Sequence, residues 1–218
     1  MNGVLFDLDG VIADTSVFHF KAWRKLIQDH FKQDLPPELE SQTKGVSRQD
    51  SLTAILNYLQ ITVSQADFAN LCNEKNTYYR KLLTDLSSAD ILPGISELIN
   101  QLKKHHFKLA LASASLNGPL ILDKLSLSNS FDAIADPQQV TLGKPAPDIF
   151  LAAASAINVK VTDCIGIEDS IAGIQAINSA GAFSIGIGSQ AELSQAKFIV
   201  PNTAELTFAK MVTAYQNN

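Results

Sequence analysis

The sequence predicts an α/β fold in which a doubly wound parallel sheet carries an inserted α-helical cap. From about residue 87 to the C-terminus, short apolar runs alternate with helical stretches, as in a parallel sheet with helices on both faces. Residues 15–86 show helical periodicity without a convincing strand. One strand at the N-terminus is too short to be stable unless it joins the later sheet. We therefore expect a Rossmann-like core domain of residues 1–14 and 87–218, interrupted by a cap domain of residues 15–86.

The first predicted strand ends in two carboxylates one residue apart, Asp7 and Asp9, and Gly10 lets the chain turn away. Side chains alternate along a strand, so both acids point to the same side. In open α/β sheets, ligands bind at the carboxyl ends of the strands. Two acids at that edge without basic neighbours in the sequence indicate cation binding or catalysis. For the Asp-x-Asp pair alone, an ordinary polar turn is the alternative.

The predicted cap is helical. Apolar side chains recur at the helical period over residues 17–31, and Pro36-Pro37 interrupts the next segment. Two later helices open with a serine and, three residues on, an aspartate, which is typical of helix N-termini: Ser47 with Asp50 and Ser64 with Asp67. Because this unit is inserted directly after the two acids, it is suited to close over them and exclude water.

The second part of the chain supplies the rest of the core. Strands are predicted at residues 107–112, 133–134, 164–167, 183–187 and 198–200. Helices are predicted at residues 95–102, 117–125, 147–157, 170–180 and 203–215. This alternation brings the carboxyl ends of several strands to one edge of the sheet.

Polar side chains follow two of these strands. After residues 107–112 come Ser113, Ser115 and Asn117, whose donors at a helix start can form an anion site, although a serine there can also be a simple cap. After residues 164–167 come Glu168 and Asp169, which can equally be an acidic pair favoured by the helix dipole. Together with the first strand, these strand ends gather acids and hydroxyls at one edge.

Two motifs resemble those of the haloacid dehalogenase superfamily: Asp7-Leu8-Asp9-Gly10-Val11 and, later, Gly-Lys-Pro-Ala-Pro-Asp-Ile-Phe at residues 143–150. Without this context Lys144 would be an exposed surface lysine. The resemblance implies a phosphotransferase in which Asp7 is the nucleophile, Asp9 exchanges a proton with the substrate oxygen, and Lys144 neutralises the phosphoryl group. It also implies a Mg²⁺ site formed by Asp7, the main-chain carbonyl of Asp9, Asp169 and Glu168.

A closer resemblance, to the β-phosphoglucomutases of this superfamily, extends over essentially the whole chain. It is carried by Asp14-Thr15, His-Phe-x-Ala-Trp at 19–23, Lys-Gly-Val-Ser-Arg at 44–48, Ser-Ala-Ser-x-Asn-Gly-Pro at 113–119 and Phe-Asp-Ala-Ile-Ala-Asp-Pro at 131–137. It implies interconversion of β-D-glucose 1-phosphate and glucose 6-phosphate through a phospho-Asp7 enzyme, with β-glucose 1,6-bisphosphate as activating intermediate. The substrate- and phosphate-binding residues that it implies are Thr15, His19, Trp23, Lys44, Gly45, Val46, Ser47, Arg48, Gln49, Lys75, Ser113, Ala114, Ser115 and Asn117.

Within that set, Arg48 is expected to bind the phosphate that is not being transferred, together with Ser115 and Asn117, because a guanidinium suits bidentate phosphate binding. The chain departs from the resemblance at Leu116, where some members of the family have a lysine that helps this distal phosphate. A leucine side chain cannot donate a hydrogen bond to phosphate.

The composition and net charge of the chain exclude several classes of binding partner. The chain of 218 residues has a formal net charge of −5 and no basic run, which argues against nucleic-acid binding. No apolar stretch approaches the roughly 20 residues that cross a bilayer, and residues 1–13 contain acids where a signal peptide carries Lys or Arg. We expect a cytoplasmic monomer that acts on small sugar phosphates.

Three other functions stay open at this point. A sugar-phosphate phosphatase of the same superfamily would discharge phospho-Asp7 to water. A phosphonate hydrolase would need a cap lysine that forms a Schiff base, for which Lys44 or Lys75 is available. A sugar-phosphate sensor without catalysis is the third, since a fold alone does not give function.

Overall fold

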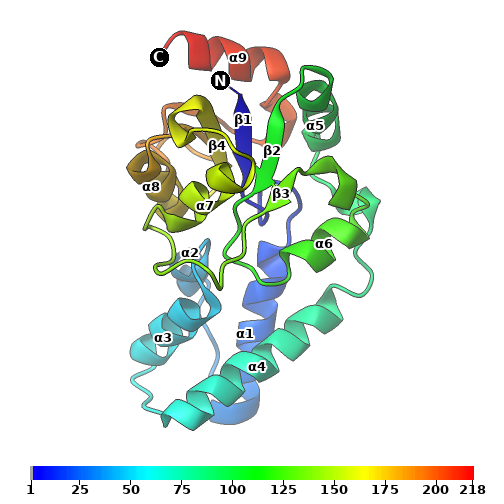
Figure 1. Cartoon of the computed structure of the whole chain (residues 1–218). Helices are drawn as coiled ribbons and strands as arrows, with labels where there is room; N and C mark the ends of the chain where they lie inside the picture. The colour runs from blue at the N-terminus through cyan, green and yellow to red at the C-terminus, as the bar shows by residue number, and fades with distance from the viewer. Residues whose placement is uncertain (1) are drawn as a thin grey trace.

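Strand β1 (Gly3–Phe6) lies inside a six-stranded parallel sheet of order β3-β2-β1-β4-β5-β6 (Figure 1). The computed structural model describes residues 2–218. The other strands are β2 (Lys108–Leu111), β3 (Ala133–Ile134), β4 (Cys164–Glu168), β5 (Phe183–Ile187) and β6 (Phe198–Val200). The predicted doubly wound parallel sheet is confirmed. Its strand order reverses between β1 and β4, the point at which such sheets bind ligands.

Helices cover both faces of this sheet (Figure 1). They are α5 (Ile95–Lys104), α6 (Gly118–Lys124), α7 (Asp148–Ala156), α8 (Ile171–Ala180) and α9 (Phe208–Gln216). The alternation of β1 is visible in the packing: Val4 and Phe6 lie in the apolar cluster with α5, α6 and α9, whereas Leu5 lies in the cluster with α7 and α8. A strand buried on both faces explains why this run is apolar throughout.

The helix predicted at residues 203–215 is interrupted. A short 3₁₀ helix, Thr203–Glu205, comes first, and α9 begins only at Phe208. The Thr207 hydroxyl accepts a hydrogen bond from the Lys210 backbone N–H and caps the second helix. Asn202 caps the first turn in the same way, accepting from the Glu205 backbone N–H. Two polar caps in succession divide one apolar stretch into two elements.

Four helices form the unit that was predicted as a cap: α1 (Ser16–Phe31), α2 (Glu38–Thr43), α3 (Arg48–Tyr58) and α4 (Gln65–Leu82). They enclose an apolar cluster of their own, with Trp23 and Ile55 among its buried members. Both predicted caps are present, because the hydroxyls of Ser47 and Ser64 accept from the backbone N–H groups of Asp50 and Asp67. The domain boundaries at residues 14 and 87 stay a prediction.

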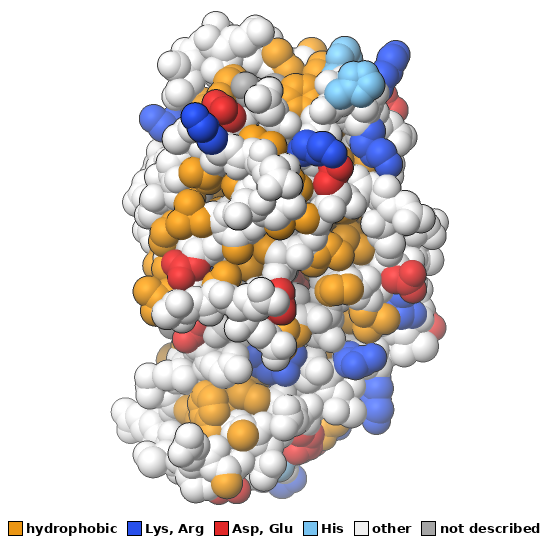
Figure 2. Space-filling model, viewed as in Figure 1, with side chains coloured by type: hydrophobic (Ala, Val, Ile, Leu, Met, Phe, Trp, Pro, Cys, Tyr) orange, Lys and Arg blue, Asp and Glu red, His pale blue; other side chains and the backbone are white. Residues whose placement is uncertain are grey.

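The cap lies at the opposite end of the molecule from both termini and α9 (Figure 1). On the face shown in Figure 2, positive and negative side chains are interspersed rather than gathered into one field. Within residues 2–218, no helix combines the length and hydrophobicity that spanning a membrane requires.

Candidate active site

Lys144 lies between two carboxylates at the base of the site. Its Nζ donates to Asp7 Oδ1 at 2.6 Å and to Glu168 Oε1 at 2.7 Å. The side chain is fully buried and lies over the ring of Phe150. Burial by itself would lower the pKa of Lys144, but the charges of Asp7 and Glu168 raise it above its ordinary value. These two carboxylates therefore favour the protonated, positively charged form of Lys144 beside Asp7.

Three acids from two neighbouring strand ends form a cluster. Oxygens of Asp7, Glu168 and Asp169 all lie within 4.8 Å of one another, because β1 and β4 are paired in parallel. Glu168 is held firmly, since its Oε2 accepts the backbone N–H groups of Asp169 and Ser170 at 2.7 Å each. Carboxylate oxygens are the ligands that Mg²⁺ prefers.

The electrostatics of this cluster favour a divalent cation. Burial, reinforced by the charge of Glu168, raises the pKa of Asp169 to about 7, and Lys44 only partly opposes this. Buried carboxylates that crowd one another in this way are stabilised by added positive charge. The residues present therefore fit Mg²⁺, with Asp7, Glu168 and Asp169 as the side chains that would hold it.

Gly10 makes this close approach possible. It adopts a φ of 77°, in the left-handed region that glycine tolerates best. A Cβ at this position would overlap the Asp169 carboxylate. Any side chain at position 10 would therefore displace an acid of the cluster, which gives the glycine of the Asp-x-Asp-Gly motif a steric role.

Asp9 points away from the acid cluster and toward the cap. Its Oδ1 accepts a short hydrogen bond from the Thr15 hydroxyl, and its Oδ2 lies 3.9 Å from His19 Nε2. Burial raises the pKa of Asp9. Burial together with the charge of Lys75 lowers the pKa of His19, which favours the neutral imidazole. The surroundings of the Asp9 carboxyl therefore favour its protonated form, and that side chain lies outside the cluster of Asp7, Glu168 and Asp169.

A cavity of about 210 Å³ lies between the cap and the carboxyl edge of the sheet. Asp7 and Asp9 line it from the core, and so do Ser113, Ala114 and Ser115. The cap contributes these predicted substrate-binding residues to the same wall: His19, Lys44, Gly45, Val46, Ser47, Arg48 and Gln49. The cavity therefore collects residues from widely separated parts of the sequence.

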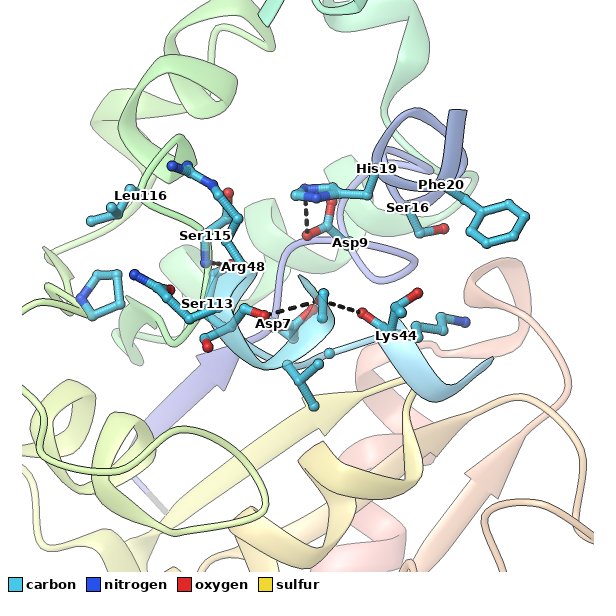
Figure 3. A pocket seen from close by; sticks show the side chains of 18 of the residues that line it. Asp7, Asp9, Ser16, His19, Phe20, Lys44, Arg48, Ser113, Ser115 and Leu116 are labelled. Atoms are coloured by element: carbon cyan, nitrogen blue, oxygen red, sulfur yellow. Dashed lines mark hydrogen bonds and ion pairs between the residues drawn. The ribbon is translucent and has the colours of Figure 1, made fainter. Parts of the chain in front are cut away.

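Arg48, Ser115 and Leu116 lie on one side of this cavity (Figure 3). Arg48 Nη2 donates to Asn76 Oδ1 at 2.8 Å, and no carboxylate within residues 2–218 forms an ion pair with Arg48. The Leu116 side chain is 45% exposed. A guanidinium without a counterion on a cavity wall is suited to bind an anion.

Lys44 lies on another side of the cavity, with Ser16 and Phe20 (Figure 3). Its Nζ forms an ion pair with Asp169 Oδ2 at 2.7 Å, which joins the cap to the acid cluster of the core. Next to it, Gly45 has a φ of 74° and lies so close to Ser170 that a Cβ would overlap the Ser170 hydroxyl. The loop between α2 and α3 is therefore packed directly on the loop after β4.

A family model described as haloacid dehalogenase-like hydrolase matches residues 1–181. The chain belongs to this family. Asp7 and Asp9 of the first motif line the cavity, and Lys144 of the second motif lies buried behind Asp7 and is bonded to it.

Individual relatives of this haloacid dehalogenase-like protein include mutases and phosphatases. The chain is 42% identical to a β-phosphoglucomutase of Bacillus subtilis, over 95% of this chain and 92% of the relative. It is 30% identical to a phosphorylated carbohydrates phosphatase of Thermotoga maritima, over 83% and 82% of the two chains. The crystal structure of a β-phosphoglucomutase from Clostridium difficile superposes with a TM-score of 0.97 at 40% identity, covering 100% of this chain and 98% of that one.

Four residues predicted to bind substrate lie behind the cavity wall of this family member. Thr15 holds Asp9, and Lys75 Nζ lies 2.6 Å from His19 Nδ1. Trp23 packs its ring against the Lys75 ammonium, 4.8 Å from Nζ to the ring centroid. Asn117 donates to Asn76. Direct contact of these four residues with substrate stays a prediction.

Several residues of the cavity wall were not predicted from the sequence. Those without a predicted role are Ser16, Phe20, Glu40, Thr43, Ser51, Pro137 and Gln138. Phe20 and Pro137 belong to segments that carried the family resemblance. Their position within those segments was the one sequence feature that could have predicted their place in the wall. Asn76 is not on this wall, and only its contacts with Arg48 and Asn117 reveal its connection with the site.

Proposed function

We propose that the protein is a β-phosphoglucomutase, which interconverts β-D-glucose 1-phosphate and glucose 6-phosphate through phospho-Asp7 and β-glucose 1,6-bisphosphate. The observation that carries this proposal is a cavity with a cationic side chain near each of two separate parts of its wall. Asp7 lines its base, with Lys144 buried directly behind that carboxylate, and Arg48, which has no carboxylate partner within residues 2–218, lies on its cap wall. The mutases of Bacillus subtilis and Clostridium difficile, at 42% and 40% identity, support the same function.

The reaction follows from the partners of each residue. An oxygen of Asp7 attacks phosphorus, forming a phosphoaspartate while the bond from phosphorus to the sugar oxygen breaks. Asp9 gives its proton to the departing sugar oxygen, and its raised pKa favours the protonated form that this step needs. In the reverse direction Asp9 takes the proton from the sugar hydroxyl as that oxygen attacks the phosphoaspartate.

Lys144 provides positive charge for both directions, because its raised pKa favours the protonated form and its Nζ donates to Asp7. When bound by Asp7, Glu168, Asp169 and the main-chain carbonyl of Asp9, Mg²⁺ would supply further neutralisation of phosphoryl charge. Thr15 and His19 keep the Asp9 carboxyl directed at the cavity.

Arg48 is the group that a mutase needs and simple hydrolysis does not. The bisphosphate has to present each of its ends to Asp7 in turn, and the idle phosphate then lies away from the base of the cavity. We propose that Arg48, Ser115 and Asn117 bind this idle phosphate. We also propose a monomer, since one chain lines the whole cavity, and a cytoplasmic location, since sugar phosphates are charged and do not cross membranes unaided.

A sugar-phosphate phosphatase is the second candidate, supported by the 30% identical relative from Thermotoga maritima. A phosphonate hydrolase has less support, because Lys75 lies behind His19 and Lys44 is paired with Asp169. A single assay separates mutase from phosphatase. Purified protein with Mg²⁺, β-glucose 1-phosphate and a trace of β-glucose 1,6-bisphosphate should form glucose 6-phosphate much faster than free phosphate. Stoichiometric release of free phosphate without glucose 6-phosphate would establish the phosphatase instead.

A further inference from the structure

Asn76 on α4 connects three parts of the molecule through one atom. Its Oδ1 accepts a hydrogen bond from Arg48 Nη2 at 2.8 Å and another from Asn117 Nδ2 at 2.9 Å. Arg48 is the first residue of α3 in the cap, and Asn117 directly precedes α6 in the core. A single amide oxygen therefore fixes the direction of Arg48 and joins the cap to the core.

The acceptor for Arg48 is neutral, which preserves the charge of the guanidinium. Among the described residues, one N–H of the Arg48 guanidinium donates to Asn76, which leaves further N–H groups of this cavity-lining residue for a ligand. Burial lowers the pKa of Arg48. A carboxylate at position 76 would hold the same geometry but would neutralise the charge.

Other cations cannot readily replace Arg48 at this side of the cavity. Of the two cationic residues among those that line it, Lys44 is already paired with Asp169. Leu116, next along the same side, offers only apolar surface (Figure 3). Affinity for an anion there depends on how Arg48 is aimed.

We propose that Asn76 is a positioning residue that aims Arg48 at the idle phosphate while leaving the arginine charge free to bind it. Because Asn117 of the core donates to the same oxygen, Arg48 is held in this direction when the cap is closed on the core. This inference rests on the proposed function.

The test separates the effect of losing the hydrogen-bond acceptor from the effect of adding a negative charge, at two positions of helix α4. Asn76→Ala removes the acceptor, and Asn76→Asp keeps its shape but adds a charge. Asn73→Ala and Asn73→Asp, at an exposed position of α4 one turn away, are the matched controls. The probe is glucose 6-phosphate with Mg²⁺ and aluminium fluoride, where the fluoride complex stands in for the phosphoryl group at Asp7. Its dissociation constant is measured by calorimetry, and the melting temperature is measured beside it.

Asn76→Asp should weaken binding by roughly ten- to a hundred-fold, because the arginine charge is neutralised, and Asn76→Ala by less. The melting temperature of Asn76→Asp should stay level or rise, since it gains an ion pair with Arg48. The controls should bind within about twofold of the unmodified protein. In an Arg48→Ala background, Asn76→Ala should have little further effect.

Two outcomes would overturn the inference: an Asn76→Asp variant that binds as tightly as the unmodified protein, or effects of Asn76→Ala and Arg48→Ala that simply add. Neither outcome depends on turnover. If the unmodified protein releases only free phosphate, the proposed mutase function fails, while the binding pattern still decides the role of Asn76.

Discussion

At the scale of single residues, two aspartates close in sequence have different surroundings. Asp7 is bonded to Lys144 inside the acid cluster, whereas Asp9 is bonded to Thr15 and faces His19. Asp7 lies beside the ammonium group of Lys144, whereas Asp9 lies beside a hydroxyl and an imidazole whose lowered pKa favours the neutral form. These different partners support the different roles proposed for the two aspartates.

Asp7→Asn should abolish phosphoenzyme formation while keeping the fold, because an amide is a poor nucleophile. Incubation with acetyl phosphate and Mg²⁺, followed by mass spectrometry of the intact protein, measures the phosphoryl group on Asp7. Far-ultraviolet circular dichroism serves as the control for folding. A phosphorylated, active Asp7→Asn protein would show that another residue is the nucleophile.

Asp9→Asn should slow turnover by roughly 10²–10⁴ because proton exchange with the sugar oxygen is lost. Mg²⁺ affinity should stay nearly unchanged, since the Asp9 carboxylate lies outside the cluster of Asp7, Glu168 and Asp169. Calorimetric titration with Mg²⁺ and a steady-state mutase assay measure the two effects. A large loss of metal affinity would mean that the Asp9 side chain is itself a ligand.

Lys75 should give the stability of the fold a characteristic pH dependence. Burial first, and then the charge of Arg48, lower its pKa to about 7, against weaker opposing effects of Asp9 and Cys72. An unfolded lysine has a pKa of about 10.4, so between roughly pH 7 and 10 the unfolded chain binds one more proton here than the folded chain. This site therefore favours the folded state more as pH rises through that window.

Lys75→Met removes this titration. The melting temperature of the variant minus that of the unmodified protein should be most positive at or below pH 7 and should fall toward pH 10. Differential scanning calorimetry at several pH values measures the difference. A difference that is constant from pH 7 to 10 would show that Lys75 does not titrate in this range.

At the scale of elements, the loop between α2 and α3 is where the cap contacts the acid cluster of the core. Lys44 in this loop pairs with Asp169, Gly45 packs against Ser170, and Ser47 begins α3 as its cap. A helix start that is fixed by its cap thus positions a lysine at the acid cluster. Lys44 and a divalent cation would place like charges beside the same carboxylate.

Lys44→Met should therefore tighten Mg²⁺ binding by roughly tenfold, because a competing positive charge is removed. Calorimetric titration of the substrate-free protein at constant ionic strength measures this change. Lys25→Met is the matched control, since Lys25 is exposed on α1 and its Nζ contacts Asp29 and the Tyr78 ring rather than the acid cluster. Unchanged or weaker Mg²⁺ binding in Lys44→Met would contradict the antagonism.

Element types were largely predictable because their signals are local. The apolar run of residues 183–187 and the capping serines at 47 and 64 gave elements that the structure contains. The division of residues 203–215 was missed, because the apolar period continues while the caps at Asn202 and Thr207 determine where each helix begins. Local hydrogen bonding outweighed periodicity there.

At the scale of the whole molecule, function depends on how the cap meets the core. The sequence indicated which residues belong to the site, and Lys44 to Gln49 do line the cavity. The sequence could not indicate which of these residues reach the cavity surface. Thr15, Trp23 and Lys75 lie behind other side chains, and this arrangement depends on how helices α1 and α4 pack together. Long-range packing of this kind leaves no periodic signal in a single sequence.

Closure of the cap should decide between sugar and water as acceptor. Arg48→Ala removes a charge-assisted contact and should weaken affinity for β-glucose 1,6-bisphosphate by roughly ten- to a hundred-fold, with a matching fall in mutase turnover. Hydrolysis of phospho-Asp7 should survive or rise, since water is excluded less well. Parallel assays of glucose 6-phosphate and free phosphate measure both. Unchanged glucose 6-phosphate formation in Arg48→Ala would show that Arg48 is not needed for the mutase reaction.

The central position of β1 also affects how the protein is made. Gly3 pairs with Lys108 on one side and with Cys164 on the other, so β1 is synthesised well before either of the strands that it pairs with. The segments that form α1 to α4 are complete before either neighbour has been synthesised. During that interval the apolar residues of β1 are exposed to solvent or covered by a chaperone. Translation pauses that fall before Cys164 would prolong the exposure of this strand and with it the risk of aggregation.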